Sequence, residues 1–296
     1  MVAIKTLLVV LQPGKVVQPV WPQALAWAQA LGAHLEVLVP VAPDVKPGLE
    51  LAPPLEDMAA RNAEHQAQPW LETLLAAAPA GTGRTIVATT NWAETVLHEA
   101  RRLEADLLML GQCEQDPARN PDLKPLLRQL PSPLYLARRD KAPRRIAAAL
   151  GAGAEDAPHR LLNQAVLEHL VALVLKFQGE ARVLSALPNP VELVPLMGDA
   201  YAASYVGTDL EAGYRDNLQK QITAFGLAEG VLKVSPGRPD LVLPELVQEE
   251  GVDCLILGTV ARKGFAAFWL GNTAEDVLPR VGSDVLLLRP QDYMDP

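Results

Sequence analysis

The stretch VSPGRPDLVLPELVQEEGVDCLILG, residues 234–258, repeats a passage found earlier in the chain. The earlier passage is ATTNWAETVLHEARRLEADLLMLG, residues 88–111, and both passages end in an apolar run followed by glycine. Self-similarity at this spacing indicates a duplicated structural unit. Further segments correspond in the same way, Thr6–Leu11 with Arg145–Leu150 and Leu130–Arg138 with Val281–Arg289.

Each copy alternates short apolar runs with amphipathic segments of helix length. This alternation predicts βαβ units and a parallel sheet that is buried on both faces. A chain of 296 residues is long enough for two such domains, which we place at residues 1–143 and 144–296. The predicted fold class is therefore α/β, with two tandem doubly wound (Rossmann-like) parallel-sheet domains. In the second copy the expected strands are Ile146–Leu150, Ala181–Leu187, Val231–Val234, Asp253–Leu257 and Asp284–Leu288.

Composition excludes several classes of protein. The net charge of −9 disfavours nucleic-acid binding, because the chain lacks a general basic field to attract phosphates. No apolar run is long enough to span a membrane. The N-terminal IKTLLVVL leads into Gln12-Pro13-Gly14 without a small-residue cleavage site, so it predicts a strand and not a signal peptide. We therefore expect a cytoplasmic protein.

Motifs for catalysis and metal binding are missing from the sequence. Cys113 and Cys254 are far apart and grouped neither with each other nor with histidines, which argues against a disulfide framework and against a metal site. There is no G-x-S-x-G elbow and no Cys/His nucleophile pair. The sequence predicts no catalytic residues and a protein that is not an enzyme.

The stretch LGTVARKGFAAFWLGNTAEDVL, residues 257–278, has the arrangement of a ligand-binding turn. Ligands of open parallel sheets bind beyond the carboxyl ends of the strands, where Gly258 is expected to lie. A helix that restarts at Gly271 would offer backbone N–H groups to a phosphate. Alternatively, Asn272 or Thr273 only caps that helix, and the spacing leaves both interpretations open.

This stretch resembles the signature of the universal stress protein family, Gly-x2-Gly-x9-Gly-(Ser/Thr), and is most similar to the tandem E-type members. Gly258 matches the first glycine of the signature, Gly271 matches the third, and Asn272 stands at the Ser/Thr position. Ala261 replaces the second glycine. The resemblance covers the whole chain as two copies and implies a non-enzymatic stress-response protein.

Departures from the family pattern bear on the ligand. ATP-binding members carry an aspartate in the loop after the first strand, where this chain has Gly151 in the second copy and Gln12 in the first. The first copy also loses the later glycines of the signature after Gly111. These departures argue against ATP binding of the usual kind, and the resemblance implies a small phosphate-bearing or amphipathic ligand, such as a nucleotide, in the second copy alone. The expected ligand contacts are Gly258, Thr259, Arg262, Gly271, Asn272 and Thr273.

A long connection, LPNPVELVPLMGDAYAASYVGTD, occupies residues 187–209 of the second copy. Connections in compact domains are usually much shorter, and long ones often serve as lids. A lid would turn apolar side chains toward a ligand, whereas an interface segment would pack them against the other domain or a partner chain. Both interpretations remain open. The lid residues would be Val191, Leu196, Met197, Tyr201 and Tyr205.

The two copies are expected to pack as a pseudo-symmetric pair, and two chains as a homodimer are a further expectation. The last strand of each copy, Leu134–Ala137 and Val285–Leu288, is an apolar sheet edge, and such edges are generally covered. Two other functions remain open. One is a scaffold or interaction module whose pockets are vestigial. The other is an ATP-hydrolysing enzyme, although no carboxylate stands near the turn to hold a metal ion.

Overall fold

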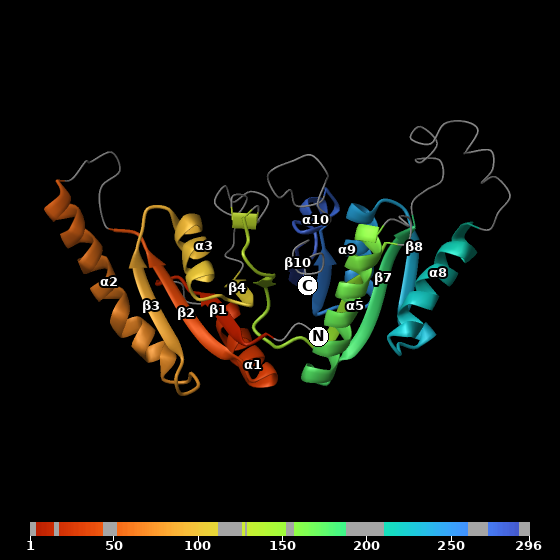
Figure 1. The fold of residues 1–296 in the computed structure, drawn as a ribbon, viewed down its shortest axis with the longest axis horizontal. Coiled ribbons are helices and arrows are strands. Elements are labelled where there is room, and N and C mark those ends of the chain that lie inside the picture. Colours follow the sequence, from red (N-terminus) through yellow and green to blue (C-terminus); the bar gives the residue numbers. More distant parts are fainter. Residues whose placement is uncertain are drawn as a thin grey trace. The chain divides into compact units, whose positions relative to one another are not determined.

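The computed structural model describes residues 4–14, 18–43, 52–111, 126–127, 129–151, 157–187, 210–259 and 272–289. The chain divides into two compact units, Ala3–Ala142 and Pro143–Pro296, which we call the first and the second domain. Each has alternating strands and helices (Figure 1).

The first domain is built around five parallel strands in the order β3-β2-β1-β4-β5. The chain therefore adds β2 and β3 on one side of β1 and then returns to add β4 and β5 on the other side. The elements are β1 (Thr6–Val10), α1 (Val20–Leu31), β2 (His34–Val41), α2 (Pro53–Leu75), β3 (Gly83–Ala88), α3 (Trp92–Arg102), β4 (Leu107–Gly111) and β5 (Leu134–Ala137).

The second domain repeats this topology, with five parallel strands in the order β8-β7-β6-β9-β10. The predicted fold class, tandem doubly wound α/β domains, is confirmed. The elements are β6 (Arg145–Ala149), α5 (Ala157–Phe177), β7 (Glu180–Leu187), α8 (Leu210–Ala224), a short 3₁₀ turn η1 (Glu229–Val231), β8 (Leu232–Pro236), α9 (Pro239–Glu249), β9 (Cys254–Gly258), α10 (Asn272–Val277) and β10 (Asp284–Leu288).

The expected strands of the second domain are all present, with ends that differ by one or two residues. β10 has the predicted bounds, and β8 begins at Leu232 where Val231 was expected. The difference at β8 arises because Val231 belongs to the 3₁₀ turn η1, whose backbone is not extended.

The core lies along the central strands of each sheet. Leu7, Leu8 and Val9 of β1 are completely buried, as are Leu255 and Ile256 of β9. Adjacent residues of a strand point to opposite faces, so complete burial of a run requires cover on both faces. In the second domain α5 packs on β6, β7 and β9, whereas α9 and α10 pack against each other. Right-handed crossovers place these two groups of helices on opposite faces.

A carboxylate that precedes the fourth strand of each domain fastens the first strand in place. Asp106 lies before β4 and Asp253 before β9, and one oxygen of each accepts two consecutive backbone N–H groups. These bonds give the start of the first strand the acceptors that the sheet does not supply. The amides are those of Lys5 and Thr6, at 2.7 and 2.9 Å, and those of Arg144 and Arg145, at 2.9 and 2.8 Å.

Candidate functional site

The strand order places the switch point of the second domain beside β6. β6 lies between β7 and β9. The next strand beyond β7 is β8, and the next strand beyond β9 on the other side is β10, so the sheet grows from β6 in opposite directions. Loops part at such a point, so the carboxyl ends of β6 and β9 form the place where ligands of this fold class bind. Gly151 follows β6, and Gly258 and Thr259 end β9, so the structure brings three of the residues singled out in the sequence to this edge.

Gly258 is a glycine because a side chain from α5 occupies the space beside it. A Cβ added at Gly258 would lie 1.9 Å from Cδ1 and 2.7 Å from Cγ of Leu162. The first domain shows a milder form of the same contact, since a Cβ at Gly111 would lie 3.3 Å from Cγ1 of Val20 in α1. The glycine at position 258 therefore allows a close approach of helix to strand.

Thr259 has a structural role that the sequence did not reveal. It is 1% exposed, and both its backbone N–H and its hydroxyl donate to the carbonyl oxygen of Leu288, at 3.1 and 3.2 Å. These bonds fasten the end of β9 to the end of β10. In this geometry neither donor points to a ligand.

Gly151, at the place of the family's aspartate, belongs to a network of side-chain amides. Nδ2 of Asn163 donates to the carbonyl oxygen of Gly151 at 2.8 Å and to Oε1 of Gln221 at 2.9 Å. Gln221 in turn donates to Oδ1 of Asn217 at 2.7 Å. Asn163 belongs to α5 and the other two residues to α8, so the network joins both helices to the end of β6. It supplies no carboxylate.

The remaining expected contacts lie at or beyond the limit of the described residues. Helix α10 begins at Asn272, and Ala274 and Val277 bury its inner side. The side chains of Asn272 and Thr273 lie outside the described residues. The same holds for Arg262, Gly271 and the five lid residues, Val191, Leu196, Met197, Tyr201 and Tyr205.

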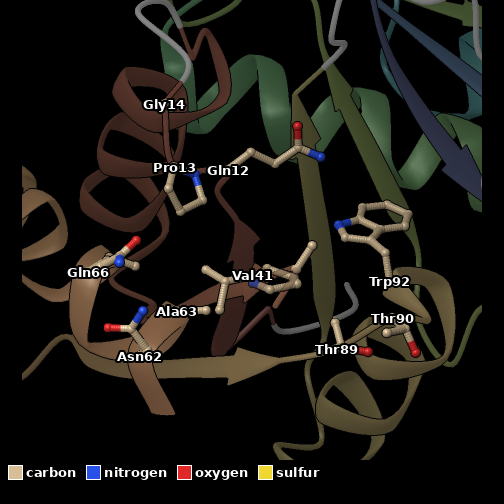
Figure 2. A pocket seen from close by; sticks show the side chains of 13 residues that line it. Gln12, Pro13, Gly14, Val41, Asn62, Ala63, Gln66, Thr89, Thr90 and Trp92 are labelled. Carbon is tan, nitrogen blue, oxygen red and sulfur yellow. The ribbon is translucent and has the colours of Figure 1, made fainter. Parts of the chain in front are cut away.

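A pocket that sequence reasoning missed lies in the first domain. It is an open hollow of about 590 Å³ at the carboxyl ends of β1, β2 and β3, between α2 and the start of α3 (Figure 2). No spacing rule marks such a space, because its size depends on residues from four separate segments of the chain. The one sequence signal was Gln12, noted only as a replacement for the family's aspartate. The lining residues are Gln12, Pro13, Gly14, Pro40, Val41, Ala42, Asn62, Ala63, Gln66, Ala67, Thr89, Thr90 and Trp92.

Titratable groups offer little chemistry in the described part of the chain. Within these ranges no three His, Cys, Asp or Glu side chains come together as metal ligands. Cys254 is a completely buried thiol in β9, and its burial, reinforced by the nearby carboxylate of Asp284, raises its pKa well above the ordinary range. Such a thiol is a poor nucleophile, because the thiolate is the reactive form.

None of the described helices combines the length and the apolarity needed to cross a bilayer.

Comparison with known proteins finds a family match within the second domain. Residues 160–289 match the model of the universal stress protein family. Universal stress protein E of Escherichia coli (strain K12) is 28% identical over 176 residues, which are 58% of this chain and 55% of that protein. The chain thus spans about half the length of this relative. A universal stress protein E homolog of Haemophilus influenzae is 27% identical over 218 residues, which are 71% of this chain and 70% of that protein.

A solved structure agrees with the fold over nearly the whole chain. A functionally unknown protein from Pseudomonas aeruginosa PAO1 superposes with a TM-score of 0.71 at 24% identity, covering 99% of this chain and 95% of that one. At this level of identity the likeness concerns the fold. The family match assigns residues 160–289 to the universal stress protein family, and the two relatives show that the chain is similar to its E-type members.

Proposed function

We propose that this protein is a non-enzymatic, cytoplasmic stress-response protein whose second domain binds a small phosphate-bearing or amphipathic ligand. Membership of the universal stress protein family supports the role in stress. We assign residues 1–143 to a universal stress protein domain with a degenerate nucleotide motif. Residues 144–296 form the domain that partly retains the motif. We expect the two domains to pair within the chain.

The position of the signature at the switch point carries this proposal. The signature leaves the sheet where β9 ends at Gly258 and reaches helix α10 at Asn272. It thus starts from the edge at which open parallel sheets bind ligands. We assign contact with the ligand to Gly258, Arg262, Gly271, Asn272 and Thr273. Thr259 is assigned the supporting role of anchoring the turn to β10, because its donors are directed at Leu288.

A second candidate function, an interaction module with a vestigial second-domain pocket, is favoured by two contacts. Leu162 fills the space beside Gly258, and Asn163 holds the carbonyl of Gly151 where the family's aspartate would meet a ribose. Both contacts occupy volume or donors that a nucleotide would use. The proposed ligand binding therefore depends on the residues around Gly271, where the signature would hold a phosphate.

Calorimetric titration of the full-length protein with ATP and with inorganic pyrophosphate separates the two functions. In the Gly271→Val variant a side chain would block approach to the backbone, and we expect binding to weaken more than about tenfold, or about 1.4 kcal/mol. Gly282→Val is the matched control, because Gly282 is exposed and a Cβ there meets nothing within 4 Å.

The proposal predicts that Gly282→Val binds like the parent protein and that both bind more tightly than Gly271→Val. Equal affinities for all three proteins, or no binding by the folded parent, would favour the interaction module. Circular dichroism of each variant confirms the fold before titration.

A further inference from the structure

We infer that β3, at the edge of the first-domain sheet, pairs in antiparallel orientation with the same strand of a second copy of this chain. β3 is the last strand on its side of the sheet and pairs with β2 alone among the described residues. The sequence raises the expectation of a homodimer but indicates no surface for it. Because β3 is separate from the second-domain signature, the inference does not depend on the proposed ligand.

Every second residue of β3 turns its backbone groups away from β2. The N–H of Thr89, directly after the strand, donates to the carbonyl of Val41 in β2 at 2.8 Å. In a parallel strand the N–H and C=O of one residue point to the same side, and those of the next residue point to the other side. The backbone groups that point to the open edge are therefore those of Arg84, Ile86 and Ala88.

A side chain of α2 confirms this direction. Oε1 of Glu64 accepts from the backbone N–H of Ala88 at 2.9 Å, at a position where a neighbouring strand would place a carbonyl. The N–H and C=O groups of Arg84 and Ile86 have no partner among the described residues. None of the six residues of β3 is fully buried, as expected for a strand at an open edge.

The corresponding edge strand of the second domain, β8, is blocked at each edge position. The same alternation identifies these positions, because Gly237 donates its N–H to the end of β7. The N–H of Leu232 is bonded within the turn η1, and the carbonyl of Val234 accepts from Nη2 of Arg215 at 3.0 Å. Pro236 has no N–H to offer. Proteins commonly protect sheet edges by such devices, and β3 has only one of them, at Ala88.

One register of two β3 strands uses all the edge positions. With the two copies of Ile86 opposite each other, each donates its N–H to the carbonyl of the other. Arg84 then lies opposite Ala88 of the second copy and donates its N–H to that carbonyl, while the N–H of Ala88 stays with Glu64. A register centred one residue earlier or later places an edge residue opposite a position outside the strand.

Arg84 and α2 lie on the same face of the sheet. A Cβ at Gly83 would meet the carboxylate of Glu36, so these two positions share a face. Arg102 of α3 interacts with Glu36, which identifies this as the face that α3 covers. The next residue, Arg84, points to the opposite face. Right-handed crossovers place α2 on that face, because the chain adds β3 in one direction and returns through α3 in the other.

Charge complementarity favours a second copy as the occupant of this edge. The side chain of Arg84 is exposed and forms no ion pair among the described residues, and the same is true of the second carboxylate oxygen of Glu64. Opposite residues of antiparallel strands are close neighbours, so Arg84 of one copy lies beside Ala88 of the other and the Glu64 carboxylate bonded to it. The twofold axis forms this pair twice. The exposed charge that would discourage other strands thus gains a partner in a second copy.

Sedimentation velocity of the full-length protein over a series of concentrations measures the dimerisation. We expect a species of twice the 31.9 kDa chain mass to grow with concentration. Arg84→Gln and Glu64→Gln each remove both ion pairs, and the glutamine at 64 keeps an oxygen for Ala88. Each should raise the dimer dissociation constant about two- to thirtyfold, as expected for two exposed ion pairs. The double variant should be no weaker than either single variant, because the pairs are already lost.

The control is Lys233→Gln, which removes a charge from the blocked edge strand β8 and should leave the dissociation constant unchanged. Arg84→Glu brings two carboxylates together and should abolish the dimer. In the parent protein, hydrogen exchange of the β3 segment should slow as concentration rises, because the Ile86 amide becomes bonded.

Three results would overturn the inference. The first is a protein that keeps the mass of one chain at every concentration. The second is a dimer that persists in Arg84→Glu or weakens in Lys233→Gln, because the contact would then lie elsewhere. The third is a double variant whose loss equals the sum of the two single losses, because Arg84 and Glu64 would then not be paired.

Discussion

Replacing Gly258 by alanine tests whether this residue of the family signature serves the packing of helix on strand. An alanine Cβ would lie 1.9 Å from Cδ1 and 2.7 Å from Cγ of Leu162, distances at which carbon atoms cannot coexist. Leu162 must therefore leave its position. If Leu162 is first shortened to alanine, the three nearest atoms, Cδ1, Cγ and Cδ2 of Leu162, are gone, and Gly258→Ala should cost much less.

The magnitudes follow from the burial of the two partners. Overpacking of a filled site costs about 1–3 kcal/mol, and we expect Gly258→Ala to fall in this range. Leu162 is half-buried, so Leu162→Ala should cost less than the about 2–5 kcal/mol typical of a fully buried leucine. The double variant should be no less stable than Leu162→Ala. The two substitutions should thus be coupled by about 1–3 kcal/mol.

Differential scanning calorimetry of the parent protein, both single variants and the double variant measures this coupling. A loss of 1 kcal/mol lowers the melting temperature of a domain of this size by about 2–4 °C, so Gly258→Ala alone should shift the second-domain transition by about 2–12 °C. If the shifts of the single variants simply add in the double variant, the contact with Leu162 does not explain why this position is glycine.

Three further predictions concern stability and assembly. Asp253→Ala should lower the stability of the second domain by about 1.5–3 kcal/mol, because two backbone N–H groups lose a charged acceptor; an unchanged denaturation midpoint would show that the fastening of β6 is dispensable. Cys254 should resist thiol reagents in the folded protein. Burial raises the pKa of this thiol, so as pH rises the thiol loses its proton in the unfolded chain before it does so in the folded protein. The free energy of unfolding should therefore fall as pH rises above about 8.5. Urea denaturation between neutral and alkaline pH checks this, because Cys254→Ala should remove that part of the slope, and an identical slope in the variant contradicts it. The expected pairing of the two domains through their last strands predicts slow hydrogen exchange at every amide of Leu134–Ala137 and Val285–Leu288, whereas rapid exchange at alternate amides would indicate open edges.

The fold was accessible from the sequence because its signals are local. Alternating apolar runs and amphipathic segments specify which residues are buried, and the duplication allowed each copy to support the interpretation of the other. Even the end of β9 at Gly258 followed from an apolar run that stops at a glycine. These features depend on neighbours within a few residues along the chain.

The site was less accessible because its contacts join distant segments. Nothing in the spacing around Gly258 reveals that Leu162 of α5 fills the adjoining space, or that Leu288 of β10 takes both donors of Thr259. The first-domain pocket is a still stronger case. It lies where the small side chains of Ala63 and Ala67 on α2 face the ends of the strands, and a hollow of this kind leaves no motif. Only the positions of all the surrounding side chains reveal it.

Native mass spectrometry of the purified protein shows whether it carries a bound small molecule, as the proposed function requires. We expect a species heavier than the 31.9 kDa chain by the mass of a small molecule, which is lost when the protein is denatured. Loss of the adduct in Gly271→Val would assign it to the second domain. A folded protein that shows only the mass of the bare chain, and that binds neither ATP nor pyrophosphate when they are added, would contradict ligand binding.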